Sequence, residues 1–67
     1  MRYVVTELEG YLTAGHRVPG LTVSVLDRAV CHRPVFQRRT EDEYQGWVKR
    51  QAVRAGASAR CDELNAA

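Results

Sequence analysis

The segment LTVSVL, residues 21–26, alternates apolar and small polar residues, and this alternation constrains the fold more than any other feature. Leu21, Val23 and Val25 fall on one side of an extended chain, and the polar residues between them fall on the other. A period of two indicates a strand with one face in a core. We therefore expect a sheet built on a strand over residues 21–27, with another element covering its apolar face.

Two further strands are predicted around this segment. Residues 2–8 carry β-branched and aromatic side chains, and residues 31–39 return the chain after a turn at Asp27–Ala29. Pro34 lacks a backbone donor, so the last strand is expected to be an edge or bulged strand.

The connection over residues 9–20 is long for so small a domain. Two arrangements fit its sequence. Tyr11 and Leu12 either extend the first strand through a bulge near Gly10 or pin the loop to the core.

The segment Thr40–Glu43 predicts the start of a helix, with Glu41 as its first residue. Thr40 is a typical N-cap, Glu43 completes a capping box, and the acidic run favours the positive end of the helix dipole. The predicted fold class is α+β: a short antiparallel three-stranded sheet packed on one face by a C-terminal α-helix, in the order β-β-β-α.

The predicted helix carries two apolar strips on nearly opposite sides. The strip expected against the sheet follows steps of three and four, and Trp47 is expected to provide its largest burial. Its members are Tyr44, Trp47, Val48, Gln51, Ala52, Ala55 and Ala59. The second strip consists of Val53, Ala57, Cys61 and Leu64, and either the helix bends near Gly56 or this strip is free for a partner. Gly56 weakens the helix by up to about 1 kcal/mol, and the sequence leaves open whether the helix ends there.

The charge of the chain bears on nucleic-acid binding. Ten Lys and Arg against eight Asp and Glu give a net charge of +2, far from that of a dedicated nucleic-acid binder. The arginines of the predicted second hairpin could still follow a phosphate backbone, and they are Arg28, Arg33, Arg38 and Arg39, with Arg17 nearby. Against this, Phe36 is the lone aromatic expected on the exposed sheet face, and solvated charges explain the same arginines.

Cys31, His32 and Arg33 place a thiol, an imidazole and a guanidinium side by side. In a strand, consecutive side chains point to opposite faces, so these three cannot meet one reactant, and Cys31 is expected in the core. His16 and Cys61 could complete a site, but no pair has the C-x2-C or H-x3-H spacing of a zinc site. We therefore predict no catalytic residue, no metal and no cofactor, and two free thiols.

The chain length of 67 residues supports a single domain, residues 1–67, with a thin core. No apolar run approaches the roughly 18 residues of a membrane span, and no signal-peptide core follows the N-terminus. A cytoplasmic protein without membrane contact is expected.

Four short segments resemble small accessory proteins of actinobacteriophages, of the mycobacteriophage type, and of their hosts. The segments are Val23–Asp27, Cys31–Arg33, Arg39–Asp42 and Glu63–Ala66. The resemblance implies a protein made in a bacterial cytoplasm that binds a host protein to redirect or inhibit it, and it implies no catalytic residues.

The leading hypothesis is a non-enzymatic protein-interaction module. Its candidate interaction residues are Arg28, Arg33, Arg38, Arg39, Val53, Cys61 and Leu64. The alternative is a small nucleic-acid-binding protein that uses the basic sheet. A homodimer through the edge strand or through the second helix strip would help to stabilise so small a core.

Overall fold

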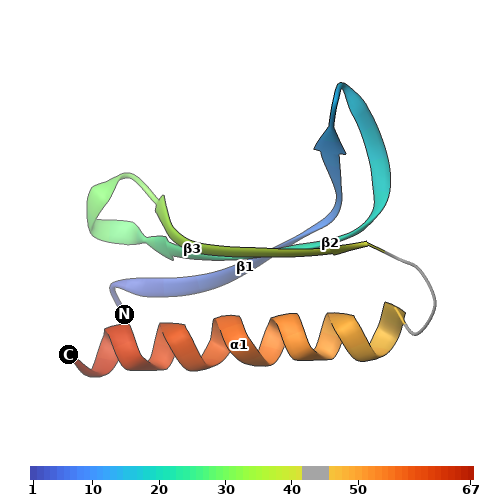
Figure 1. The fold of residues 1–67 in the computed structure, drawn as a ribbon. Coiled ribbons are helices and arrows are strands. Elements are labelled where there is room, and N and C mark those ends of the chain that lie inside the picture. Colours follow the sequence, from blue (N-terminus) through green and yellow to red (C-terminus); the bar gives the residue numbers. More distant parts are fainter. Residues whose placement is uncertain (42–45) are drawn as a thin grey trace.

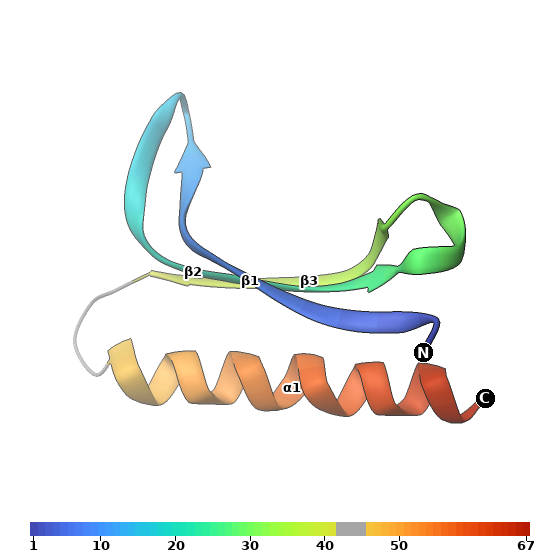
Figure 2. The ribbon, with the colours of Figure 1, turned by 180° about the vertical axis from the view of Figure 1, so that it is seen from behind.

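The computed structural model describes residues 1–41 and 46–67, and in them it shows a three-stranded antiparallel sheet followed by a helix (Figure 1). The elements in chain order are β1 (Tyr3–Thr13), β2 (His16–Asp27), the 3-10 helix η1 (Arg28–Val30), β3 (Arg33–Glu41) and α1 (Gly46–Ala66). β2 is the central strand, and α1 lies along one face of the sheet (Figures 1 and 2). The predicted α+β class and β-β-β-α order are confirmed.

β1 and β2 are longer than predicted, because most of residues 9–20 belong to them. The register between the two strands shifts after Glu9, at Gly10, whose φ of 75° is a conformation that favours glycine. Pairing then continues to a tight turn at Ala14 and Gly15, which have φ angles of 49° and 80°. The arrangement with a bulge near Gly10 is thus the one adopted, and this end of the hairpin rises away from α1 (Figure 1).

The predicted turn after β2 is confirmed, but it is longer than expected. The Asp27 carboxylate accepts a hydrogen bond from the Ala29 amide at 3.0 Å and caps η1. Cys31 and His32 then adopt left-handed φ angles of 50° and 57°, and β3 begins only at Arg33. The prediction that Cys31 and His32 lie in a strand is therefore wrong. A turn of 3-10 helix needs left-handed residues to reverse the chain here, and without a glycine the sequence gives no sign of them.

The prediction of a bulged edge strand at Pro34 is confirmed. Val25 pairs with Phe36 and Leu26 pairs with Pro34, so Val35 is the extra residue of a bulge. Pro34 stands near the start of an edge strand, where a missing backbone donor is tolerated.

The core lies between β2 and α1. The alternation in β2 is confirmed, because its predicted apolar side is fully buried. The buried apolar residues are Leu21, Val23, Val25, Ala57 and Cys61, and Tyr3, Phe36, Val53 and Leu64 pack against them.

The side of α1 that faces the sheet is opposite to the predicted one. Val53, Cys61 and Leu64 pack on the sheet, so the prediction that they form a free strip for a partner is wrong. Trp47 is 67% exposed and Val48 is also exposed, so the prediction that Trp47 supplies the largest burial is wrong as well.

Two features of α1 explain this orientation. Ala57 and Cys61 are small enough for the helix to lie close under the large side chains of β2. Arg50 and Arg54, on the same side of the helix, reach the carboxylates of Glu9 and Glu7 at 2.7 and 2.6 Å. The other strip offers an equally regular spacing, but no cations that meet the acids of β1.

The ends of α1 differ from the prediction. Thr40 and Glu41 belong to β3, so a helix beginning at Glu41 is wrong. Asp42, Glu43 and Tyr44 lie outside the described residues. The helix continues without a break through Gly56. Within the described ranges, no helix combines the length and the hydropathy needed to cross a bilayer.

Candidate interaction surface

The structure does not bring the cysteines and histidines of the chain together. Cys31 and His32 are exposed in the turn after η1, so the prediction that Cys31 lies in the core is wrong. Cys61 is buried under the sheet, where its thiol donates to the Tyr3 carbonyl oxygen at 3.4 Å. His16 begins β2, at the other end of the strand from η1. Both thiols are free, and across residues 1–41 and 46–67 no three His, Cys, Asp or Glu side chains cluster as a metal site would require.

The predicted basic hairpin does not form one surface. Arg38 pairs with buried Val23 on the side of α1, and its guanidinium lies 4.4 Å from the ring centre of Phe36. Phe36 packs against the core, so its predicted place on the exposed sheet face is wrong. Arg39 pairs with Thr22 and therefore projects to the other face.

The other two arginines lie at the turn between β2 and β3. Arg28 donates to the Met1 carbonyl oxygen at 3.2 Å. Arg33 pairs in register with Asp27, and its charge helps to lower the pKa of that carboxyl. Both arginines therefore interact with other groups of the protein at this end of the sheet.

A bidentate ion pair between Arg2 and Asp27 holds this end together, and no pattern in the sequence predicts it. Arg2 Nε and Nη2 donate to the two Asp27 carboxylate oxygens, both at 2.9 Å. The hydrogen bond from Arg2 is the main cause that lowers the pKa of Asp27; burial opposes it, and the Ala29 amide adds to it. The Arg2 guanidinium also lies 5.3 Å from the ring centre of Tyr3.

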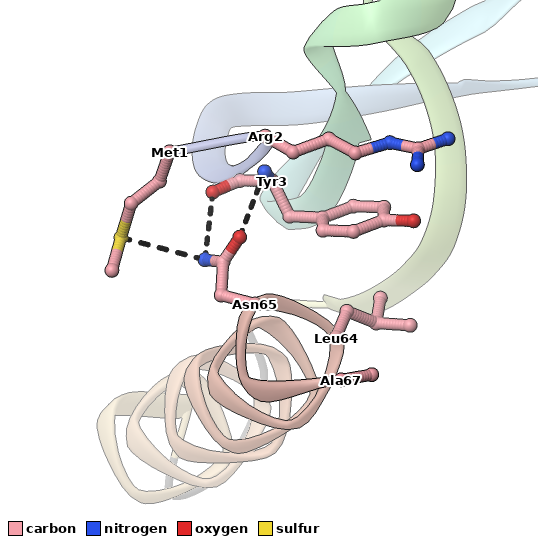
Figure 3. Close-up of a pocket in the computed structure, with 6 residues that line it drawn as sticks. All are labelled: Met1, Arg2, Tyr3, Leu64, Asn65 and Ala67. Carbon is pink, nitrogen blue, oxygen red and sulfur yellow. Dashed lines mark hydrogen bonds between the residues drawn. The ribbon is translucent and has the colours of Figure 1, made fainter.

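A pocket of about 320 Å³ lies beside this ion pair, where the start of β1 meets the end of α1 (Figure 3). It is lined by Met1, Arg2, Tyr3, Leu64, Asn65 and Ala67. The Asn65 amide accepts from the Tyr3 amide and donates to the Tyr3 carbonyl oxygen, both at 3.0 Å. Asn65 and Arg2 both bind protein groups here, so the pocket is a junction between the two ends of the fold.

The face of the sheet away from α1 is the larger feature, and we call it the open face. The ion pairs of Glu7 and Glu9 with α1 place the odd-numbered residues of β1 on the helix side, so the even-numbered residues face away. Through the strand register, the open face consists of Val4, Thr6 and Leu8 of β1, Thr22, Ser24 and Leu26 of β2, and Pro34, Gln37 and Arg39 of β3. No described element covers it, and both ends of the sheet rise around it (Figures 1 and 2).

The open face is mostly uncharged. Of the described residues assigned to it, Arg39 is the single formally charged one. Leu8 is 58% exposed, and Gln37 donates to the Ser24 hydroxyl at 3.1 Å. The Thr22 hydroxyl in the centre is buried and has no hydrogen-bond partner among the described residues. An unpaired buried hydroxyl costs about 1–3 kcal/mol, so this threonine is unfavourable for stability alone.

Comparison of the chain with protein-family models, with curated proteins and with solved structures finds no match. No ligand or activity therefore comes to this chain from a relative. Its own surfaces are the basis for a function.

Proposed function

We propose that the protein is a non-enzymatic interaction module that docks a partner protein on the open face. The observation that carries this proposal is the one-sided cover of the sheet by α1. In a domain with two layers, the second face of the sheet is free for a partner, and here it carries exposed Leu8 beside uncharged polar groups. Apolar centres with few charges are typical of protein interfaces.

The charges of the sheet favour a protein over a nucleic acid as the partner. Phosphate binding relies on several cations that act together. Arg38 and Arg39 point to opposite faces, and Arg39 is the single cation among the described residues of the open face. Among the residues assigned to this face in the described part of the chain, none is aromatic, since Phe36 packs on the helix side.

Thr22 supports the same surface. Its hydroxyl lies between the β1 and β3 residues that pair with it, Leu8 and Arg39. A partner that reaches this hydroxyl supplies a hydrogen bond that the described residues of the free protein do not provide. Such a gain favours the bound state, because the penalty for the unpaired group is present only in the free protein.

A bacterial host protein is the partner that we propose, in line with the resemblance of four segments to actinobacteriophage proteins. We place this encounter in the bacterial cytoplasm. The two free thiols support this placement, because free cysteines are typical of reducing compartments.

The test is a pull-down from bacterial lysate with immobilised wild type and three variants. Thr22→Glu and Gln37→Glu each put a carboxylate on the open face, and Val48→Glu puts one on the exposed outer side of α1 as a matched control. Circular dichroism first establishes that each variant is folded. We expect wild type and Val48→Glu to retain the same protein, both open-face variants to lose it, and nuclease treatment to change nothing.

Two results would contradict the proposal. Loss of the retained protein in Val48→Glu alone would move the surface to α1. Retention that nuclease abolishes, together with DNA binding that falls steeply as salt is added, would replace the proposal by nucleic-acid binding.

A further inference from the structure

We infer that two copies of this chain pair antiparallel through the free edge of β1 and form one six-stranded sheet, with the twofold axis at Thr6. This inference concerns main-chain groups at the edge of the sheet. It does not rest on the proposed function, which concerns side chains of the open face.

The shape of the molecule makes its strand edges prominent. The Cα atoms span 36 × 26 × 12 Å. Three strands spaced by about 4.8 Å account for the shortest dimension. Figures 1 and 2 show the sheet edge-on from opposite sides. A sheet this narrow leaves two of its three strands with an unpaired side.

The hydrogen bonds at one end show which groups of β1 point outward. The Arg28 amide donates to the Arg2 carbonyl oxygen at 2.8 Å, so the even-numbered residues of β1 exchange hydrogen bonds with β2. The odd-numbered residues therefore direct their amides and carbonyls to the free side. Tyr3 confirms this alternation, because both of its outward groups are bound by the Asn65 side chain.

Val5 and Glu7 are the next residues with outward groups. In the described part of the chain, no residue binds the outward amide or carbonyl of either one. Their side chains are exposed, as are those of Thr6 and Leu8. The edge from Val5 to Leu8 is thus open to a further strand.

The opposite edge, β3, is protected. Pro34 has no amide to offer, the bulge at Val35 interrupts the ladder, and the Arg38 guanidinium donates to the outward carbonyl of Gln37 at 2.9 Å. Between Val5 and Leu8, β1 has none of these devices, and its pairing with β2 is regular over that range. Of the two edges, β1 is the one that can accept a strand.

A second copy fits this edge in one register. With Thr6 opposite Thr6 of the second copy, Val5 lies opposite Glu7 and Val4 lies opposite Leu8. The outward groups of Val5 and Glu7 then form four main-chain hydrogen bonds across the axis. The Asn65 contact at Tyr3 and the bulge at Gly10 limit the paired stretch to this short region.

The side chains suit the same register. Val4 and Leu8 form two apolar pairs on the open face, and cross-strand pairs of this kind stabilise sheets. On the helix side, Glu7 faces Val5 rather than another acid, and its carboxylate is already paired with Arg54 at 2.6 Å. Trp47 lies three and seven residues before Arg50 and Arg54, so helical spacing places this exposed ring on the flank of α1 next to β1.

Light scattering with two substitutions at one residue tests the main-chain contact. Glu7→Pro removes an outward amide without touching the ladder to β2, and Glu7→Ala removes the same side chain but keeps the amide. The expected mass of wild type and Glu7→Ala is twice the 7.6 kDa of one chain, and that of Glu7→Pro is 7.6 kDa. A wild type that stays at 7.6 kDa at all concentrations, or a dimer that Glu7→Pro leaves intact, overturns the inference.

Cysteine crosslinking tests the register independently, and it decides the question should Glu7→Pro fail to fold. Thr6→Cys is made in a Cys31→Ser background, so that no native exposed thiol remains in the described residues. In this register two Thr6 residues form a non-hydrogen-bonded pair with Cα atoms about 4.5 Å apart, a distance that allows a disulfide. We expect a covalent dimer under mild oxidation, and none from Ala55→Cys on the outer side of α1. Equal yields from the two positions, or none from Thr6→Cys, would contradict the pairing.

Discussion

The side chain of Asn65 binds both main-chain groups of Tyr3, accepting from its amide and donating to its carbonyl oxygen at 3.0 Å each. An asparagine side chain has the same donor and acceptor as a peptide group. Asn65 therefore takes the place of one residue of a neighbouring strand at the start of β1 (Figure 3). It fixes the end of α1 to the edge of the sheet and closes that end of the edge to other chains.

Replacement of Asn65 tests this contact. Asn65→Asp keeps an acceptor for the Tyr3 amide but cannot donate to the carbonyl oxygen, and Asn65→Ala loses both hydrogen bonds. We expect the free energy of unfolding to fall by about 1–3 kcal/mol in Asn65→Ala, as measured by urea denaturation. Ser58→Ala, an exposed change on the same helix, is the control and should stay within about 0.5 kcal/mol of wild type. An equal effect of the two substitutions would show that the contact is not a stabilising one.

The ion pair of Asp27 predicts how stability depends on pH. The hydrogen bond from Arg2 lowers the folded pKa of Asp27 below its unfolded value. Its contribution is therefore complete above that value and is lost as the pH falls through the folded pKa. We expect the difference in melting temperature between wild type and Asp27→Asn to be largest near pH 7 and to shrink towards pH 2. Arg2→Ala should reduce the same difference, because Arg2 is the main cause of the shift. A difference that is independent of pH would contradict this role.

Gly56 offers a stabilising substitution. It lies within continuous helix, and a Cβ atom built on it meets nothing within 4 Å. Gly56→Ala is expected to raise the free energy of unfolding by up to about 1 kcal/mol. Gly15→Ala is the matched comparison: its Cβ also meets nothing, but a φ of 80° is unfavourable for alanine, so stability should fall. Chemical denaturation of both variants compares alanine in a helical conformation at residue 56 with alanine at a positive φ at residue 15. A Gly56→Ala variant that is less stable than wild type would contradict the continuous helix at this residue.

Thr22 links stability to the proposed function. Thr22→Val replaces the unpaired hydroxyl by a methyl group of similar size, so the free protein should become more stable by about 1–3 kcal/mol. The same change removes the group that a docked partner would satisfy, and retention of the partner in the pull-down should weaken. We therefore expect Thr22→Val to raise the melting temperature and to reduce the amount of partner retained. A Thr22→Val that melts lower than wild type would indicate that the hydroxyl has a partner in solution.

The sequence predicted the elements of the fold better than their contacts. The alternation in residues 21–26 and the proline at position 34 each reflect a strong local preference, and both were confirmed. The left-handed conformation of Cys31 and His32 was missed because neither residue type favours that conformation strongly enough to predict it. An exposed sheet face was expected, but the residues of β1 that lie on it were not assigned, because both sides of β1 carry apolar residues, for example Val4 and Val5. Only the carboxylates that reach α1 decide which side is covered.

The side of α1 that faces the sheet was predicted wrongly, and two alanine substitutions test the side that the structure shows. Both strips of the helix repeat every three or four residues, so periodicity alone cannot choose between them. The structure buries Ala57 completely and leaves Ala55 exposed. Ala57→Leu should therefore overpack the contact with β2 and lower the free energy of unfolding by about 1–3 kcal/mol, whereas Ala55→Leu should leave it within about 0.5 kcal/mol. Both changes add the same side chain to the same helix, so the comparison cancels helix propensity. Urea denaturation with the reverse ranking would mean that α1 is turned by about half a rotation and that Ala55, not Ala57, faces the sheet.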